Sequence, residues 1–574
     1  MPGRQVFNSC SSASASGGRG FPRPFPVRLS IAIASHFHCN ERITKSYSTV
    51  TRTQYLRKDA IFAILLAIWL SGYLAISLAL VTFCNAGHKE GLLVDCLEQM
   101  PNLDVVLPTD PREYKNATSV WELKIPREYP VAVVIPSSAK EIQAAVKCAI
   151  EAKIRVVPKA GGHSYEGWSV QNGTLGIDLQ AMDSVVADKS TGIVTAGPGA
   201  TLGMLYYHAW FDAGKGINGG TCPPVGLSGF LLGGGFGYYS RRAGMGCDDV
   251  VSFDMVDAKG RLLKVSKRQN KDLFWAMCGG GGGNYGVITK WSVKMMDVPD
   301  VIQYASVTYA DNVDTAAQVA DYFQSWASSA DANLGSELHV GPNSSAAKLF
   351  FFYAGSGSLS DIIDASNLKS LGSSAPKISY KNYTWIDAVV AQAGWGLQSP
   401  EQLLQRSWPD EQDYRKEKSH YVFSPGWSTS LYKTLFTQMR DMYPGGNIKF
   451  RTSGGKIAAK STTATAFPWR SALGWVITKG TWGDGSGSKQ AAYAWLEKAS
   501  ATIAAAGEKN AAYVNYIDSL LTDWPEAYYA QNYKRLQSIK SKVDPQDMFT
   551  YPIQGIVGSK PISCTLQPCV ASSS

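Results

Sequence analysis

Short apolar runs alternate with segments of helical periodicity in the part of the chain that begins near residue 131. Residues 131–135 predict a strand, and Ser138 with Glu141 forms a capping box that opens the helix after it. Three more strands are predicted, at residues 154–157, 176–179 and 193–196. Thr201 can then cap a helix that runs to Asp212. This mixture of strands and helices predicts an α/β or α+β domain.

The next stretch, residues 217–286, is rich in glycine and includes the uninterrupted run from Gly279 to Gly283. So many glycines favour a backbone that approaches a ligand closely or adopts positive φ. The pattern changes beyond Pro299, because residues 301–510 combine alternating strands, apolar helices and many Trp and Tyr residues. We therefore expect an α+β protein with two domains and a boundary near Pro299.

One apolar run is far longer than any strand. Residues 60–84 carry no charge, and as a helix they would exceed the roughly 30 Å hydrocarbon core of a bilayer. Arg57 and Lys58 precede the run, so the positive-inside rule places residues 1–58 in the cytoplasm and the chain after Cys84 in the lumen or outside. A transmembrane anchor and a signal segment cleaved near residues 84–87 both fit this pattern, and a buried core helix is the third interpretation.

Charge is distributed unevenly along the 574 residues. Of the net charge of +9, a share of +8 lies in residues 1–58, which leaves +1 for the rest of the chain. This basic head is also rich in Ser, Gly and Pro, a composition that predicts disorder. Because the body is nearly neutral, we expect no nucleic-acid partner.

Sequons and cysteines indicate the secretory pathway. Four Asn-x-Ser/Thr sites follow the long apolar run, at Asn116, Asn172, Asn343 and Asn382. We expect a secreted or membrane-anchored glycoprotein whose folded part is luminal or extracellular, where disulfides persist. Cys564 and Cys569 could close a small loop near the C-terminus. A metal site is not expected, because no Cys-x-x-Cys pair occurs and the seven His do not cluster.

A literal Gly-x-Gly-x-x-Gly pattern occurs at Gly281, Gly283 and Gly286. In a Rossmann fold this pattern follows a strand and opens a helix. Here a helix-like segment, residues 271–277, precedes it and a strand-like segment, residues 287–291, follows it. The order argues against a Rossmann nucleotide site, although exposed backbone N–H groups in the loop could still cradle phosphates.

Two other glycine-rich stretches carry reactive side chains. Residues 161–167 read GGHSYEG around His163, and residues 219–229 place Cys222 among small residues. Alone, His163 could be an ordinary turn residue and Cys222 a buried, inert thiol. Together with GFLLGGGFGYYSRRAGMGCDDV and DLFWAMCGGGGGNYGVIT further along, they resemble the berberine bridge enzyme-like flavoproteins of the vanillyl-alcohol oxidase/p-cresol methylhydroxylase superfamily. The resemblance covers about residues 92–560.

The resemblance implies an FAD-binding domain of p-cresol methylhydroxylase type over residues 92–300, completed by residues 511–560. Residues 301–510 would form an antiparallel-sheet substrate domain with helices. FAD would be held by two covalent bonds, from His163 to the 8α-methyl group and from Cys222 to C6 of the isoalloxazine ring. The other residues implied around the flavin and its pyrophosphate are Pro158, Lys159, Ala160, Gly161, Gly162, Ser164, Gly220, Val225, Gly226, Ser228, Gly229, Gly233, Gly235, Gly237, Ile288 and Asn515.

Two further features follow from the same resemblance. A disulfide between Cys96 and Cys148 is implied by a pair of cysteines that family members join. Val225, three residues after the cysteine, corresponds to a position near the flavin C4a, where valine is associated with oxygen access. The resemblance therefore favours an oxidase that reduces O2 to H2O2.

The C-terminal stretch Tyr513-Val-Asn515-Tyr516 is similar to that of the family's fungal oligosaccharide oxidases, in which a tyrosine is the general base. A strand here would put Tyr513 and Asn515 on one face and Tyr516 on the other. We therefore expect a single tyrosine to face the flavin, and we favour Tyr516.

Three residues depart from the family pattern. Phe230 stands where many members have His, Cys278 where Arg is common, and Arg451 where many relatives carry a carboxylate that helps the base. A tyrosine with an ordinary pKa of about 10 needs help to act as a base near pH 7. We predict that Arg451 or Lys449 lowers the pKa of the catalytic tyrosine electrostatically.

The expected reaction is hydride transfer from an alcohol or sugar-type C–H to FAD, while Tyr516 takes the hydroxyl proton. One alternative is a tailoring oxidase or oxidative cyclase that acts on an alkaloid or a phenolic. Another is a glycosylated surface protein that keeps its flavin without turnover. Aromatic residues such as Trp385, Trp395 and Trp408 could stack on sugars or on flat heterocycles, so they do not decide between the substrates.

Overall fold

The computed structural model describes residues 87–341, 346–394, 396–406, 414–483, 486–551 and 553–559, which belong to one compact unit. Several predictions concern residues outside these ranges: the basic head, the apolar run at residues 60–84, Asn343, Trp395, Trp408, Cys564 and Cys569. Within the described ranges, no helix has both the length and the apolar character needed to cross a bilayer.

A four-stranded sheet begins the fold, in the order β1-β2-β4-β3. Its strands are β1 (Asp104–Val106), β2 (Ala132–Ile135), β4 (Leu175–Asp178) and β3 (Val156–Lys159). The last three are parallel neighbours. Helix α2 (Pro111–Ala117) follows β1, and α3 (Ala139–Ala152) begins at the predicted N-cap Ser138. Cys148 of α3 forms a disulfide with Cys96, the partner that the family resemblance implied.

A second, antiparallel sheet has five strands in the order β5-β6-β9-β7-β8. They are β5 (Val185–Asp188), β6 (Ile193–Ala196), β9 (Val287–Lys294), β7 (Val250–Val256) and β8 (Leu262–Ser266). The helices of this region are α4 (Leu202–Ala213), α5 (Leu227–Leu232), α6 (Ser240–Ala243) and α7 (Lys271–Ala276). Thr201 caps α4 as predicted. The glycine loop of residues 279–286 lies between α7 and β9, which confirms the helix-then-strand order that argued against a Rossmann site.

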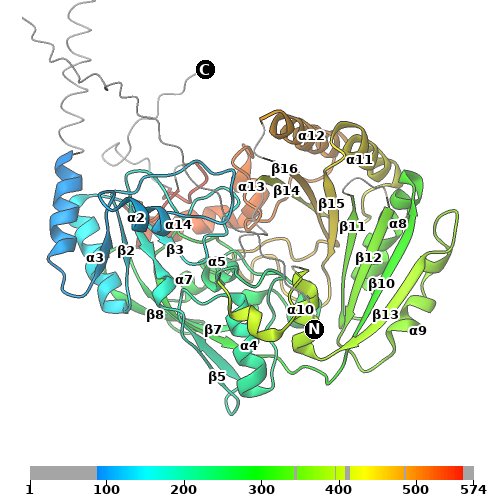
Figure 1. Cartoon of the computed structure of the whole chain (residues 1–574), viewed down its shortest axis with the longest axis horizontal. Coiled ribbons are helices and arrows are strands. Elements are labelled where there is room, and N and C mark those ends of the chain that lie inside the picture. The colour runs from blue at the N-terminus through cyan, green and yellow to red at the C-terminus, as the bar shows by residue number, and fades with distance from the viewer. Residues whose placement is uncertain are drawn as a thin grey trace, which may run out of the picture. The chain divides into compact units, whose positions relative to one another are not determined.

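The third sheet has seven antiparallel strands, in the order β13-β10-β12-β11-β15-β16-β14. They are β10 (Ile302–Asp311), β11 (Leu334–Val340), β12 (Ala346–Tyr353), β13 (Lys377–Tyr383), β14 (Tyr414–Val422), β15 (Asn447–Thr452) and β16 (Gly474–Trp482). Helices α8 (Val313–Ser329), α11 (Thr429–Met442) and α12 (Ser486–Ala505) pack on one face and bury it (Figure 1). The chain also forms helices α9 (Leu359–Asp364), α10 (Trp385–Ala393), α13 (Trp524–Tyr529) and α14 (Tyr533–Val543).

The two faces of this third sheet differ because side chains alternate along a strand. Leu338, Phe450 and Val476 point into the core under the helices. Their neighbours Glu337, Arg451 and Trp475 stand opposite one another in register on adjacent strands β11, β15 and β16. The uncovered face of the sheet therefore presents charged and aromatic side chains toward the part of the chain that carries the glycine-rich loops.

The structure confirms the α+β class but corrects one expectation inside residues 301–510. Trp385, proposed as a substrate-stacking residue, is fully buried and packs against Tyr206 and Trp210 of α4. Helix α10 therefore contributes to the core on the side of the five-stranded sheet. Its tryptophan is a packing residue, because no part of the ring is exposed to a ligand.

Candidate active site

A cavity with about 300 Å³ of free volume lies between the glycine-rich loops and the uncovered face of the seven-stranded sheet. Most of the residues predicted around the flavin line it: Pro158, Ala160, Gly161, Gly162, His163, Ser164, Gly220, Cys222, Val225, Gly226, Ser228, Gly229, Ile288 and Asn515. Tyr513, Tyr516 and Arg451 line the same cavity. Segments that are far apart in the sequence thus bring all the proposed chemistry to one place.

Four residues predicted around the flavin do not line the cavity. Lys159 instead donates hydrogen bonds to Ala117 O at 2.8 Å and to Asp178 Oδ2 at 3.0 Å. The other three are Gly233, Gly235 and Gly237, which pack against protein: an added Cβ would come within 1.8 Å of Asn515, 2.5 Å of Phe230 and 1.7 Å of Gly219 respectively. Close protein packing explains these glycines without a ligand.

The backbone around the cavity suits a large planar cofactor. Gly161 and Gly226 pack on each other, since a Cβ added to Gly161 would stand 2.3 Å from the Gly226 nitrogen, so protein packing accounts for these two glycines. At Gly229, in contrast, an added Cβ meets no described atom within 4 Å, so a side chain there would project into open space beside the cavity. The Gly281 to Gly283 loop also lines the cavity, as the phosphate-cradle hypothesis required. Gly229 and the Gly281 to Gly283 loop therefore fit a ligand that approaches bare backbone.

The two candidate attachment residues carry suitable side chains. Cys222 has a free thiol that is half-buried at the cavity wall. The imidazole of His163 stacks on Trp121, with ring centroids 4.9 Å apart. Burial, assisted by the positive charge of Arg415, lowers the pKa of His163 to about 3, so the ring is neutral at physiological pH and has a free lone pair.

The Tyr513–Tyr516 segment is a turn, which corrects the predicted strand. The Tyr516 N–H donates to Tyr513 O at 2.8 Å and closes the turn, and as a result both tyrosines line the cavity. Tyr513 stacks on Trp475, and its hydroxyl oxygen accepts hydrogen bonds from the Gly235 N–H at 2.9 Å and from Asn515 Nδ2 at 3.1 Å. No described residue makes a hydrogen bond to the Tyr516 hydroxyl. Of the two tyrosines of this turn, Tyr516 is therefore the one whose hydroxyl oxygen is available to a ligand.

Charges around Tyr516 act in opposite directions. Burial raises the pKa of Tyr516 above its ordinary value, and Arg451, the strongest of the neighbouring charges, partly opposes this rise. The Arg451 Nε donates to Glu337 Oε1 at 3.1 Å across the sheet, and Tyr238 donates to Glu337 Oε2 at 2.8 Å. Although burial alone would raise it, Arg451 and His339 hold the pKa of Glu337 well below its ordinary value. A carboxylate is therefore present beside Arg451, supplied by the neighbouring strand.

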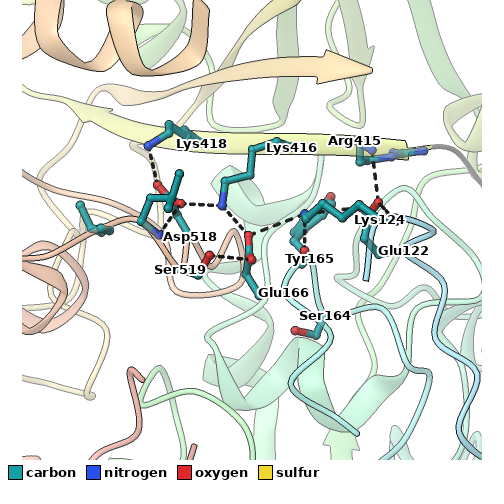
Figure 2. Close-up of polar contacts among 12 residues, drawn as sticks. Glu122, Lys124, Ser164, Tyr165, Glu166, Arg415, Lys416, Lys418, Asp518 and Ser519 are labelled. Carbon is teal, nitrogen blue, oxygen red and sulfur yellow. Dashed lines mark hydrogen bonds and ion pairs between the residues drawn. The ribbon is translucent and has the colours of Figure 1, made fainter. Parts of the chain in front are cut away.

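A network of buried ion pairs lies directly behind the cavity wall (Figure 2). The Lys416 Nζ contacts Glu166 and, at 2.6 Å, Asp518, whose second oxygen accepts from Lys418 at 2.8 Å. Lys124 joins the same cluster between Glu122 and Glu166. Four members immediately follow a cavity-lining residue in sequence, in the pairs Trp121-Glu122, Tyr165-Glu166, Arg415-Lys416 and Ile517-Asp518. The network thus ties four separate wall segments together.

Sequence reasoning missed several residues of this site. The cavity is also lined by Trp121, Tyr165, Arg415 and Trp475. Tyr165 belongs to the GGHSYEG motif, whereas no distinctive motif surrounds the other three. Cys278, noted as a departure from the family pattern, forms a disulfide with Cys247. This bond ties the start of the glycine loop to the segment before β7. The loss of Arg at 278 together with a cysteine at 247 was the available signal.

Comparison with known proteins agrees with this geometry. The model of the FAD binding domain matches residues 130–266, and the model named Berberine and berberine like matches residues 512–556. Reticuline oxidase of Eschscholzia californica is 28% identical, over 74% of this chain and 82% of its own. Berberine bridge enzyme-like Cyn d 4 of Cynodon dactylon is 30% identical, over 73% of this chain and 83% of its own. The structure of Physcomitrella patens BBE-like 1 superposes with a TM-score of 0.75 at 26% identity, covering 82% of this chain and 100% of that one.

The fold, the cavity and these matches define an FAD-linked oxidoreductase of the oxidase type. The chain belongs to the berberine bridge enzyme-like family.

Proposed function

We propose that this enzyme oxidises an alcohol or sugar-type substrate with FAD that is attached to both His163 and Cys222. The observation that carries the proposal is that one cavity is lined by His163, Cys222, Val225 and Tyr516. Bound FAD would accept a hydride from the substrate carbon and pass two electrons to O2, which gives H2O2. The protein supplies orientation and proton transfer.

In this proposal Tyr516 takes the proton of the substrate hydroxyl while its C–H bond breaks. Its hydroxyl has no hydrogen-bond partner among the described residues, whereas the oxygen of Tyr513 already accepts two hydrogen bonds. A base must reach the proton that it abstracts, so a free oxygen at the cavity favours Tyr516. Val225 lines the same cavity and would leave room for O2 beside the flavin.

The polar wall of the cavity supports a hydroxylated substrate. Arg415 and Arg451 line the side formed by the seven-stranded sheet, and Glu337 lies behind Arg451. Charged groups that can form hydrogen bonds suit a sugar better than a flat apolar heterocycle. The likeness to reticuline oxidase and the rings of Trp121, Trp168 and Trp475 support the second candidate, an alkaloid or phenolic substrate. Peroxide release from purified enzyme supplied with sugars, simple alcohols or alkaloids separates the two, and no peroxide from any of them would contradict both.

The domain limits and the location of the protein are part of the proposal. Residues 92–300 with 511–560 would bind FAD, and residues 301–510 would supply most of the substrate wall, with α10 packed on the FAD side. We infer entry into the secretory pathway, by an anchor or a cleaved signal at residues 60–84. The exposure of the sequon residues Asn116, Asn172 and Asn382 and the two disulfides support it.

Gly229→Val is expected to weaken FAD binding. The valine would project into the space that the cofactor needs, and overpacking of this kind costs roughly 1–3 kcal/mol, or about tenfold and more in binding. The ratio of FAD to protein in purified samples measures the effect. Gly91→Val is the matched control, since Gly91 is also helical and has no described atom near its Cβ, but does not line the cavity. Equal FAD content in both variants would show that Gly229 does not face the cofactor.

Removal of the charge on Arg451 is expected to move the pH dependence of flavin reduction toward higher pH. Arg451 lowers the pKa of Tyr516, so its loss raises that pKa and leaves less tyrosinate at each pH, about tenfold less per pKa unit. The variant Arg451→Met/Glu337→Gln removes both charges and avoids an unpaired buried carboxylate. Arg451→Lys should keep the profile close to that of the wild type, and Lys449→Met tests the second predicted cation. Glu337 itself raises the pKa of Tyr516, though less than Arg451 lowers it, so the double variant should shift the profile less than Arg451→Met does. An unmoved profile in both of these variants would exclude Arg451 from this role.

A further inference from the structure

Trp121 joins His163 to the rest of the cavity wall. Its ring stacks on the His163 imidazole with 16° between the ring planes, and its backbone N–H donates a hydrogen bond to Gly162 O at 3.0 Å. Trp121 therefore contacts two consecutive residues, Gly162 through its backbone and His163 through its side chain. Together they fix both the position and the tilt of the imidazole.

Arg415 in turn contacts Trp121. Its guanidinium carbon lies 4.1 Å from the centroid of the indole ring, within the range of a cation–π interaction. The Arg415 backbone N–H also donates to Glu122 Oε1 at 3.2 Å, so the Trp121-Glu122 dipeptide contacts Arg415 through both of its side chains. Lys416, the next residue, is anchored by Glu166 and Asp518 in the buried network (Figure 2). The imidazole is thus held by a continuous series of contacts from strand β14.

We propose that Trp121 and Arg415 are positioning residues that orient His163 for its covalent attachment to the flavin. The inference rests on the proposed function, which assigns the attachment to His163. Overall, the new bond joins the imidazole nitrogen to the flavin 8α-carbon. One hydrogen leaves that carbon and one leaves the imidazole, and O2 takes both hydrogens with their two electrons as H2O2.

This bond requires a neutral imidazole whose lone pair points at the reacting carbon. The first condition is met, because burial and the charge of Arg415 keep the ring deprotonated at physiological pH. The second depends on orientation, and a displacement of about 1 Å can slow a positioned reaction by about 100-fold. The attachment step is therefore expected to be sensitive to the stack on Trp121.

The test uses a Cys222→Ala parent, in which His163 is the remaining attachment residue of the proposal. Trp121→Leu in this parent should lower the fraction of flavin that stays with the acid-precipitated protein by about tenfold or more. Trp121→Phe keeps an aromatic ring for the stack and should retain most of the attachment. Arg415→Met should lower it through loss of the cation–π contact. Total FAD content and the thermal unfolding midpoint show that each variant is folded.

The matched control places Trp121→Leu in a His163→Ala parent, where attachment depends on Cys222. The retained flavin should then equal that of His163→Ala alone, and a loss as large as in the Cys222→Ala parent would overturn the inference, since Trp121 would act on the whole fold. Normal attachment in Cys222→Ala/Trp121→Leu would also overturn it. If the Leu variant does not bind FAD, Arg415→Met decides by the same measurement. Absence of covalent flavin from the Cys222→Ala parent itself would instead contradict the proposed attachment to His163.

Discussion

Tyr516→Phe is expected to slow flavin reduction by substrate by roughly 100-fold to 1,000-fold, because a positioned general base typically contributes a factor of this size. The substitution removes one oxygen and keeps the ring that packs beside Tyr165 and Trp475. Rapid mixing of the enzyme with substrate under anaerobic conditions measures the rate directly. Flavin content should remain that of the wild type, since Tyr516 does not attach the cofactor.

Tyr513→Phe is the matched control for this result. Tyr513 also lines the cavity, but its hydroxyl oxygen accepts hydrogen bonds from the Gly235 N–H and the Asn515 side chain. Its loss should disturb the turn and reduce the rate less than the loss of the Tyr516 hydroxyl. A larger decrease for Tyr513→Phe than for Tyr516→Phe would transfer the base to Tyr513.

The variant His163→Ala/Cys222→Ala is expected to release all flavin on acid denaturation. Both side chains line the cavity from different loops, so each single variant should retain flavin through the other residue. After precipitation, the double variant should give a colourless pellet and a yellow supernatant, and each single variant a yellow pellet. A yellow pellet from the double variant would show that another residue attaches the cofactor.

Local patterns in the sequence predicted much of the fold for physical reasons. Ser138 and Thr201 each precede a helix, and the side chain of each accepts a hydrogen bond from the backbone N–H three residues further along. The order of helix, glycine loop and strand around Gly281 was also evident, since it depends on neighbouring residues alone. The class of the fold and the family followed from such local signals.

Features that depend on distant contacts could not be predicted in this way. The residues from Tyr513 to Tyr516 have the composition of a strand. In the structure, however, the Tyr513 backbone N–H donates to the Ser419 side chain, and the chain then turns. Trp385 is an aromatic residue of the kind that can stack on a ligand, but in the structure it is buried against α4. Glu337 lies 114 residues from Arg451 in sequence, and only the pairing of β11 with β15 brings the two together. The carboxylate that this sequence lacks at position 451 is therefore present in the structure on the next strand.

In the proposed enzyme, one flavin is bonded to both His163 and Cys222 in the cavity that these residues share. Mass spectrometry of the proteolysed native enzyme can detect this double attachment without any substitution. We expect a single cross-linked species in which the peptide with His163 and the peptide with Cys222 are joined through one FAD. Recovery of both peptides separately and without flavin would contradict it.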